Sequence, residues 1–328
     1  MKVLRKTLVS VLFFMCICIG TSAEAKEKPT SGTDVYGNTW TYDTVTKTMT
    51  FSGEGVVGAD FVLDGHTSEP EWHCWADEAK MLIIEGSFTK IGRGSFREFA
   101  KLESIQWPDT IENIGGSAFS SCMSLKEVVI PKAVTVIDNF AFWGNDRLER
   151  VVLPTGLKKI GNFAFEGCDY LKEIVLPDTV TLVGEFAFSG CVRLQKVTLS
   201  ENMKMIKEHT FWRCKRLSQL EIPESVTKIG VGAFQRTGLK KLVIPKSVTS
   251  IYRKKGEDKY KSRDGLFKGC KNLRSVTIQS KKLKKVYKYA FTKLNKKVVF
   301  YVPKSKVKKY RKMFLASGSD KKIKIRAI

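Results

Sequence analysis

Histidine is nearly absent from this sequence, with three in 328 residues. So little histidine disfavours a His-rich metal site and makes a histidine-based catalytic centre hard to assemble. The common zinc-protease, nucleophile-elbow and P-loop motifs are missing as well. Nine prolines and 25 glycines are ordinary numbers, which excludes a collagen-like or Pro-rich low-complexity chain. Hydrophobic residues make up 43%, too many for a disordered protein. We therefore predict a folded, non-catalytic protein without a cofactor.

Long apolar runs are confined to the beginning of the chain. Lys2, Arg5 and Lys6 precede an apolar segment from Leu8 to Ile19, and a small-x-small pattern ends at Ala25. The apolar segment is shorter than the roughly 20 residues that a transmembrane helix needs. The pattern is typical of a signal peptide that is removed during export. We therefore predict that residues 1–25 direct the protein out of the cytoplasm.

A 23-residue period organises the middle of the chain. Seven phenylalanines keep this spacing: Phe96, Phe119, Phe142, Phe165, Phe188, Phe211 and Phe234. Columns of leucine, of isoleucine or valine, and of a hydrophobic residue before proline keep the same phase. One such unit cannot bury its apolar side, but units stacked about 4.8 Å apart bury it continuously. The period therefore predicts a solenoid.

One unit, residues 160–182, reads IGNFAFEGCDYLKEIVLPDTVTL. Units of this type resemble the BspA-like class of leucine-rich repeats, over about residues 91–285. Three departures are Ser200 in place of proline, Thr210 in place of alanine, and a shortened unit at Gly238. The resemblance implies a β-rich solenoid whose short strands are joined by turns or short helices. It also implies a bacterial surface or secreted binding scaffold, in some members adhesive to host matrix proteins, with no shared catalytic residue.

The two ends of a solenoid must cover an apolar cross-section. At the N-terminal end, residues 38–43 and 49–53 alternate like a hairpin, and Trp40, Trp72 and Trp75 are expected to serve as a lid. At the C-terminal end we expect a last strand over 298–303, a short amphipathic helix with Val307, Tyr310 and Phe314 on one face, and a closing strand over 323–327. The predicted division is a signal peptide (1–25), an N-terminal β cap with the first repeat-like strand (26–90), repeats with an insertion at about 252–264 (91–285), and a basic α/β C-terminal cap (286–328).

Six cysteines follow the signal peptide, and five of them share one repeat column: Cys122, Cys168, Cys191, Cys214 and Cys270. Asn145 takes this place in the unit between the first two. Export favours disulfides, whereas side chains that point in parallel from adjacent coils do not meet the geometry of a bridge. Both a ladder of buried reduced thiols and one or more bridges are therefore compatible with the sequence.

Two further motifs could be read as binding sites. Residues 53–58 match G-x-G-x-x-G, but no βαβ unit surrounds them, so we expect a glycine-rich turn in the cap and no nucleotide. Residues 64–74 crowd acidic residues, two histidines and Cys74 without a known ligand spacing. We expect a polar loop there, with a metal site as the alternative.

Outward-facing positions are the candidates for a partner surface. Val129, Val152 and Val175 occupy an outward column of the strands and could form an apolar stripe, although β-propensity alone also explains valine there. Trp143 and Trp212 share another column that is otherwise polar. These rings could stack on a sugar or a peptide, or pack on the edge of the coil.

Charge is distributed very unevenly. Residues 240–328 hold 30 Lys and Arg but four Asp and Glu, whereas residues 26–239 hold 24 and 28. This imbalance predicts contact with polyanions: teichoic acid, sulfated glycans or anionic lipid headgroups. The candidate residues are Arg253, Lys254, Lys255, Lys259, Lys261, Arg263, Lys281, Lys282, Lys284, Lys285, Lys304, Lys308, Lys309, Arg311 and Lys312.

These features together predict a non-catalytic, exported binding protein that adheres to extracellular proteins or glycans. We expect it either to be secreted or to be associated non-covalently with the cell surface. The alternatives are a structural spacer that is tethered to the cell wall by its basic end, and a polysaccharide-acting enzyme. Nucleotide binding is not expected, and nucleic acid is disfavoured by export and by the lack of a nucleic-acid motif.

Overall fold

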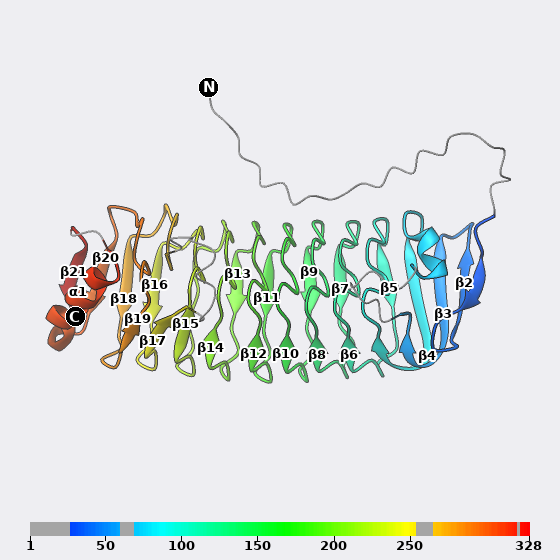
Figure 1. Ribbon diagram of the computed structural model, residues 1–328, viewed down its shortest axis with the longest axis horizontal. Coiled ribbons are helices and arrows are strands. Elements are labelled where there is room, and N and C mark those ends of the chain that lie inside the picture. Colours follow the sequence, from blue (N-terminus) through cyan, green and yellow to red (C-terminus); the bar gives the residue numbers. More distant parts are fainter. Residues whose placement is uncertain (1–26, 60–68, 254–264, 320–321) are drawn as a thin grey trace, which may run out of the picture.

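The computed structural model describes residues 27–59, 69–253, 265–319 and 322–328. The predicted signal peptide and most of the predicted insertion lie outside these residues. The described chain is a solenoid whose coils are stacked along one long axis, with a cap at each end (Figure 1). This architecture confirms the prediction from the 23-residue period.

Most repeats contribute a short strand in which one side chain points into the core, although no strand forms over residues 207–227. In β7, for example, Val128 is buried between exposed Glu127 and Val129, and β7 pairs in parallel with the equivalent residues of β9. This first column of strands comprises β5 (Ser104–Gln106), β7 (Glu127–Val129), β9 (Arg150–Val152), β11 (Glu173–Val175), β13 (Lys196–Thr198), β16 (Lys241–Ile244), β18 (Ser275–Ile278) and β20 (Val299–Val302).

A second column of still shorter strands returns the chain to the core. Its parallel pairing keeps the same period, as Ile114 pairs with Ile137 and Ile137 with Ile160. These strands are β6 (Asn113–Ile114), β8 (Val136–Ile137), β10 (Lys159–Ile160), β12 (Leu182–Val183), β14 (Met205–Ile206), β15 (Lys228–Gly230), β17 (Ser250–Tyr252) and β19 (Lys285–Val286). The sequence predicted these buried positions but not that they form a second sheet.

The segments that close the coils are turns, and no helix occurs in residues 92–253. The family resemblance implies that turns or short helices join the strands, and in this stretch turns join them. The glycines that precede Asn145, Cys168 and Cys191 have a conformational reason. Gly144, Gly167 and Gly190 have φ angles of 70°, 76° and 78°, in the left-handed region that glycine occupies without a steric penalty.

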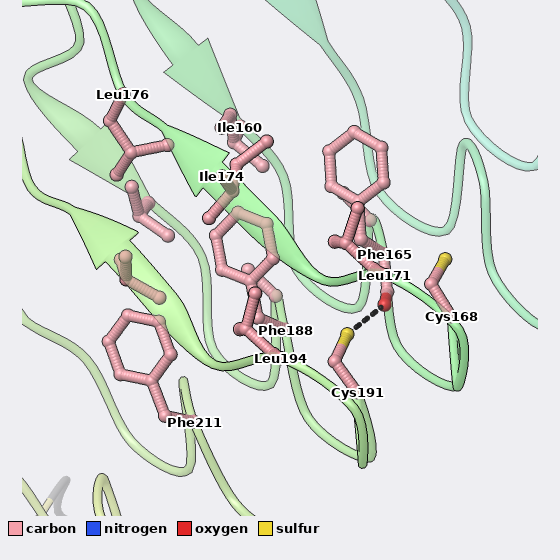
Figure 2. Packing of buried hydrophobic residues seen from close by; sticks show 14 of the residues in the cluster. Ile160, Phe165, Cys168, Leu171, Ile174, Leu176, Phe188, Cys191, Leu194 and Phe211 are labelled. Carbon is pink, nitrogen blue, oxygen red and sulfur yellow. Dashed lines mark hydrogen bonds between the residues drawn. The ribbon is translucent and has the colours of Figure 1, made fainter. Parts of the chain in front are cut away.

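The core is a continuous stack of the periodic phenylalanine rings. Neighbouring rings from Phe96 to Phe234 are stacked at centroid distances of 5.3–5.6 Å in the first coils and up to 6.4 Å later. Figure 2 shows three of these rings beside the leucine and cysteine columns. Phe267 stacks on Phe234 at 5.9 Å although 33 residues separate them, and Phe291 continues the stack. We call the stack from Phe96 to Phe291 the phenylalanine spine.

The N-terminal cap combines β1 (Ser31–Thr33), β2 (Thr39–Asp43), β3 (Thr48–Val57), a 3₁₀ turn (Glu71–Trp75) and β4 (Met81–Ile91). The predicted hairpin is confirmed, because β2 and β3 pair antiparallel. The predicted lid is confirmed too, since Trp40, Trp72 and Trp75 are buried. The ring of Phe51 contacts both Trp72 and Phe96, which joins the lid to the spine.

The prediction of a glycine-rich turn over residues 53–58 is wrong. This segment continues β3, which pairs in parallel with β4 and carries a bulge after Gly55. Gly53 faces Gly86, and a Cβ on Gly86 would clash with the carbonyl of Gly53. The glycines therefore allow two backbones to approach closely.

The C-terminal cap contains the predicted last strand, β20, then a 3₁₀ turn (Lys304–Lys306), α1 (Val307–Ala316) and β21 (Lys324–Ala327). The helix buries Tyr310 and Phe314, and the ring of Phe314 lies 4.5 Å from that of Phe291. The predicted closing strand is confirmed, because β21 pairs in parallel with β20. The helix therefore covers the end of the spine.

Candidate functional site

The structure brings two basic segments of the C-terminal end together. Lys281, Lys282, Lys284 and Lys285 are exposed at the start of β19, and α1 exposes Lys308, Lys309, Arg311 and Lys312. Tyr310 connects the two segments, because its hydroxyl donates to the carbonyl of Ser280 at 2.6 Å and accepts from the amide of Leu283 at 3.3 Å. We call these eight cations the basic end.

The remaining predicted polyanion contacts are placed less uniformly. Lys304 is exposed at the beginning of the turn before α1, and Arg253 is half-buried at the end of β17. The other candidates, Lys254, Lys255, Lys259, Lys261 and Arg263, lie outside the described residues. The described part of the predicted surface is therefore centred on β19 and α1.

Charges in the N-terminal coils pair across neighbouring coils. Lys132 contacts Asp109 at 2.6 Å, Lys159 contacts Asp138 at 3.3 Å, and Arg150 contacts Glu127. Such exposed pairs contribute little to stability, but they neutralise the surface locally. Residues 240–328 cannot do the same, because four acidic residues face 30 basic ones. The solenoid therefore has one nearly neutral region and one strongly positive end.

The valine stripe borders a groove of about 550 Å³ on the first column of strands. Val129 and Val152 line it together with Trp107, and the exposed fractions of Val129 and Val175 are both 56%. Trp107 is fixed in place because its indole N–H donates to the carbonyl of Val129 at 3.0 Å. The groove thus combines an apolar floor with an ordered aromatic wall.

The acids of this groove are held in ion pairs. Its two carboxylates, Asp109 and Glu127, pair with Lys132 and Arg150. The hydrogen bond from Lys132 lowers the pKa of Asp109 below its usual value, the opposite of what a general acid needs. The groove therefore offers contact surface for a ligand.

The two candidate tryptophans lie away from the valines. Trp143 and Trp212 are in the turns that follow the second strand of their coils, and the hollow beside Trp143 shares no lining residue with the valine groove. Trp143 is exposed, and its indole donates to Glu166 at 3.2 Å. Trp212 is half-buried under the guanidinium of Arg213. The five predicted partner residues therefore do not form one surface.

A second aromatic column escaped the sequence analysis. Phe140, Phe163, Phe186 and His209 also recur every 23 residues, two positions before the spine. Their rings stack at 4.7, 4.8 and 4.5 Å, and all four have φ between 53° and 60°. We call them the outer column, because the rings are half-buried or exposed. The spacing of three phenylalanines was the signal that could have revealed it.

The polar loop of the N-terminal cap is internally paired where it is described. Glu69 contacts His73 at 3.1 Å and Arg97 at 2.8 Å. Burial lowers the pKa of His73 below its usual value, which favours the neutral ring at pH 7. No group of three potential ligands surrounds a metal position within the described residues. Asp64 and His66 lie outside them.

The periodic cysteines are free thiols that donate hydrogen bonds to backbone carbonyls. Each donates to the carbonyl of the phenylalanine in the preceding coil, at 2.9–3.4 Å. Figure 2 shows this bond from Cys191 to Phe165. Asn145 makes the equivalent bond to Phe119 at 2.9 Å. Burial raises the pKa of the Cys122, Cys168, Cys191, Cys214 and Cys270 thiols, so these groups are structural rather than nucleophilic.

No helix in the described ranges is both long and apolar enough to cross a bilayer.

Several known structures are similar to this one, and the first of them shares its fold. A leucine-rich repeat protein from Bacteroides ovatus is 24% identical over 89% of this chain and 75% of its own, with a TM-score of 0.51. One from Eubacterium ventriosum is 18% identical over 81% of this chain and 82% of its own, with a TM-score of 0.43. A leucine rich cell surface protein from Faecalibacterium prausnitzii is 19% identical over 77% of this chain and 96% of its own, with a TM-score of 0.33. Among curated proteins, no match was found.

A family model identifies the repeats directly. The BspA type leucine rich repeat region matches in six copies over residues 74–157, 137–255 and 257–327. Repeat solenoids of this kind bind other molecules through their extended surfaces, and this family is typically non-catalytic. Because the match extends over more than half of the sequence, the chain belongs to the BspA-type leucine-rich repeat family.

Proposed function

We propose that this protein is an exported, non-catalytic adhesion protein whose basic end binds polyanions and whose strand face binds a protein or glycan ligand. The observation that carries the proposal is the segregation of charge. The excess of Lys and Arg lies in residues 240–328, and α1 presents four of these cations on a helix that is anchored by Tyr310.

Solubility alone does not require such a one-sided distribution, because interspersed charges would serve it equally well. A concentrated positive surface attracts teichoic acid, sulfated glycans or anionic headgroups, and its affinity falls steeply as salt rises. The basic helix is suited to this role because its apolar face is used within the cap. Its cations remain at the surface while Tyr310 and Phe314 stay buried.

The test reverses four charges on the helix of the full mature chain. The variant Lys308→Glu, Lys309→Glu, Arg311→Glu, Lys312→Glu leaves Tyr310 in place and removes much of the exposed positive surface of α1. We expect its affinity for heparin and for wall teichoic acid at low salt to fall at least about tenfold, with a shallower dependence on salt.

A matched control makes the same change in overall charge elsewhere. It carries glutamate at four exposed positions of the N-terminal coils, by substitution of Lys101, Lys126, Arg147 and Lys158. We expect this control to elute from heparin at a clearly higher salt concentration than the helix variant. Equal elution of the two variants would show that only net charge matters, and the proposed polyanion surface would be wrong.

The valine groove supports the second part of the proposal. Substituting Val129 and Val152 with lysine places charge on the apolar floor, and substituting Val175 places a third charge one coil beyond it, while the buried Val128 stays unchanged. We expect weaker binding to an extracellular protein or glycan partner captured by the wild-type chain, with unchanged retention on heparin. Unchanged partner binding would favour the alternative of a structural spacer held by its basic end.

A further inference from the structure

The outer column is built on an unfavourable backbone conformation. Phe140, Phe163 and Phe186 have φ angles of 60°, 57° and 57°, and such values are uncommon for a bulky side chain. Each is less favourable for phenylalanine than for glycine at the same position. The same turn position holds Gly94 and Gly232 in other coils, with φ of 67° and 64°. The exposed rings therefore occupy positions where glycine suffices for the fold.

The two ends of this column differ. At the C-terminal end, the ring of His209 lies over Gly232 so closely that even a Cβ there would clash with it. At the other end, one face of Phe140 is covered by Phe163, and the next position along the stack holds Ser117. Ser117 has the same left-handed conformation, with φ of 56°, but no ring. The column is therefore closed at His209 and open at Phe140.

A hollow of about 260 Å³ lies at this open end. Phe140 and Trp143 form its aromatic walls, with exposed fractions of 38% and 42%. Its polar walls come from Ser117, Ser121 and Asn139, together with charged groups of the coil that precedes Ser117.

Two arginines of that preceding coil, Arg93 and Arg97, complete the hollow with Glu98. Arg97 is oriented by Glu69, at 2.8 Å. Arg93 lies against Gly116, where a Cβ would come within 3.5 Å of its Nε atom. The hollow thus offers one aromatic stacking face surrounded by hydrogen-bond donors and acceptors.

We propose that this hollow is a binding site for a single pyranose ring of a glycan, which stacks its apolar C–H face on Phe140. The pyranose ring occupies the position above Ser117, where the next aromatic ring of the outer column would lie. Hydroxyl, amide and guanidinium groups around the hollow suit a ligand with hydroxyls on its edge. A phenylalanine side chain has no polar group with which to contact them. The site is separate from the basic end and from the valine groove.

The test uses the full mature chain and methyl glycosides of N-acetylglucosamine, galactose and glucuronic acid. These probes separate a neutral from an acidic sugar. Titration calorimetry and saturation-transfer NMR are expected to give a Kd near about 1 mM for at least one of them, as befits so small a ligand. N-acetylphenylalaninamide serves as the aromatic competitor.

The variant Ser117→Phe fills the site with the chain's own ring. Its backbone already has the conformation that Phe140 adopts one coil later, so we expect the melting temperature to be kept and glycoside affinity to fall at least tenfold. Phe140→Gly removes the stacking face and is expected to have the same effect on binding. Tyr170→Ala removes an exposed aromatic ring outside the hollow; it is the control and should bind within twofold of wild type.

Three results would overturn the proposal. They are glycoside binding by Ser117→Phe at wild-type affinity, no binding of any glycoside up to about 50 mM, and preferential binding of the aromatic amide. Retention of Ser117→Phe on heparin should equal that of wild type, so failure here is distinguishable from failure of the proposed polyanion surface.

Discussion

The phenylalanine spine and the outer column show how one repeat can carry two aromatic stacks with different roles. Both recur every 23 residues and both stack nearly parallel rings. Phe165 in the spine is fully buried, whereas Phe163 in the outer column is partly exposed and has a left-handed backbone. Burial therefore explains the first stack, and it does not explain why bulky rings occupy strained positions in the second.

The largest expected effect comes from breaking the spine. Phe165→Ala removes a ring that stacks on Phe142 and Phe188 at 5.3 and 5.6 Å, and leaves a cavity between coils that cannot collapse without shifting the sheets. We expect the free energy of unfolding to fall by about 3–5 kcal/mol. Urea denaturation followed by tryptophan fluorescence measures it. A loss below about 1 kcal/mol would show that the spine is not the principal source of stability.

This comparison also shows how much of the fold could be predicted from the sequence. The spine, the cysteine column, both caps and the position of α1 could be predicted, because buried positions repeat the same residue type. The second sheet was missed because strands of two residues, such as Val136–Ile137, carry no alternation to recognise. The hollow at Ser117 was missed for a related reason. It depends on a ring that is absent from one coil and on arginines from another.

The segment over residues 53–58 illustrates a different limit. Its glycines were interpreted as a turn because glycine usually interrupts strands. In the structure Gly53 faces Gly86 across two long paired strands. A Cβ on Gly86 would clash with the carbonyl of Gly53, and a Cβ on Gly53 would clash with the side chain of Asn38. The sequence of one strand alone does not reveal these neighbours. Pairings between distant segments are therefore where prediction from the sequence was weakest.

A substitution in the outer column should have a smaller effect than one in the spine. Phe163→Gly removes two stacking contacts, each contributing about 0.5–1.5 kcal/mol, but relieves a strained backbone by about 1 kcal/mol. We expect a net loss of about 1 kcal/mol, measured by the same urea denaturation. A loss equal to that of Phe165→Ala would mean that both columns are parts of one core.

A small effect of opposite sign is expected where one coil departs from the buried cysteine column. Asn145 replaces the periodic cysteine, and its Nδ2 donates to the carbonyl of Phe119, as the thiols do to their own carbonyls. Its Oδ1 atom is buried and accepts no hydrogen bond from the described residues. A buried acceptor without a donor costs about 1–3 kcal/mol. Asn145→Cys removes that acceptor and restores the thiol donor, so we expect a gain of about 1 kcal/mol in the free energy of unfolding under reducing conditions. A loss of stability would mean that the amide makes a contribution the thiol cannot replace, and that buried columns tolerate exchange less well than the shared hydrogen bond implies.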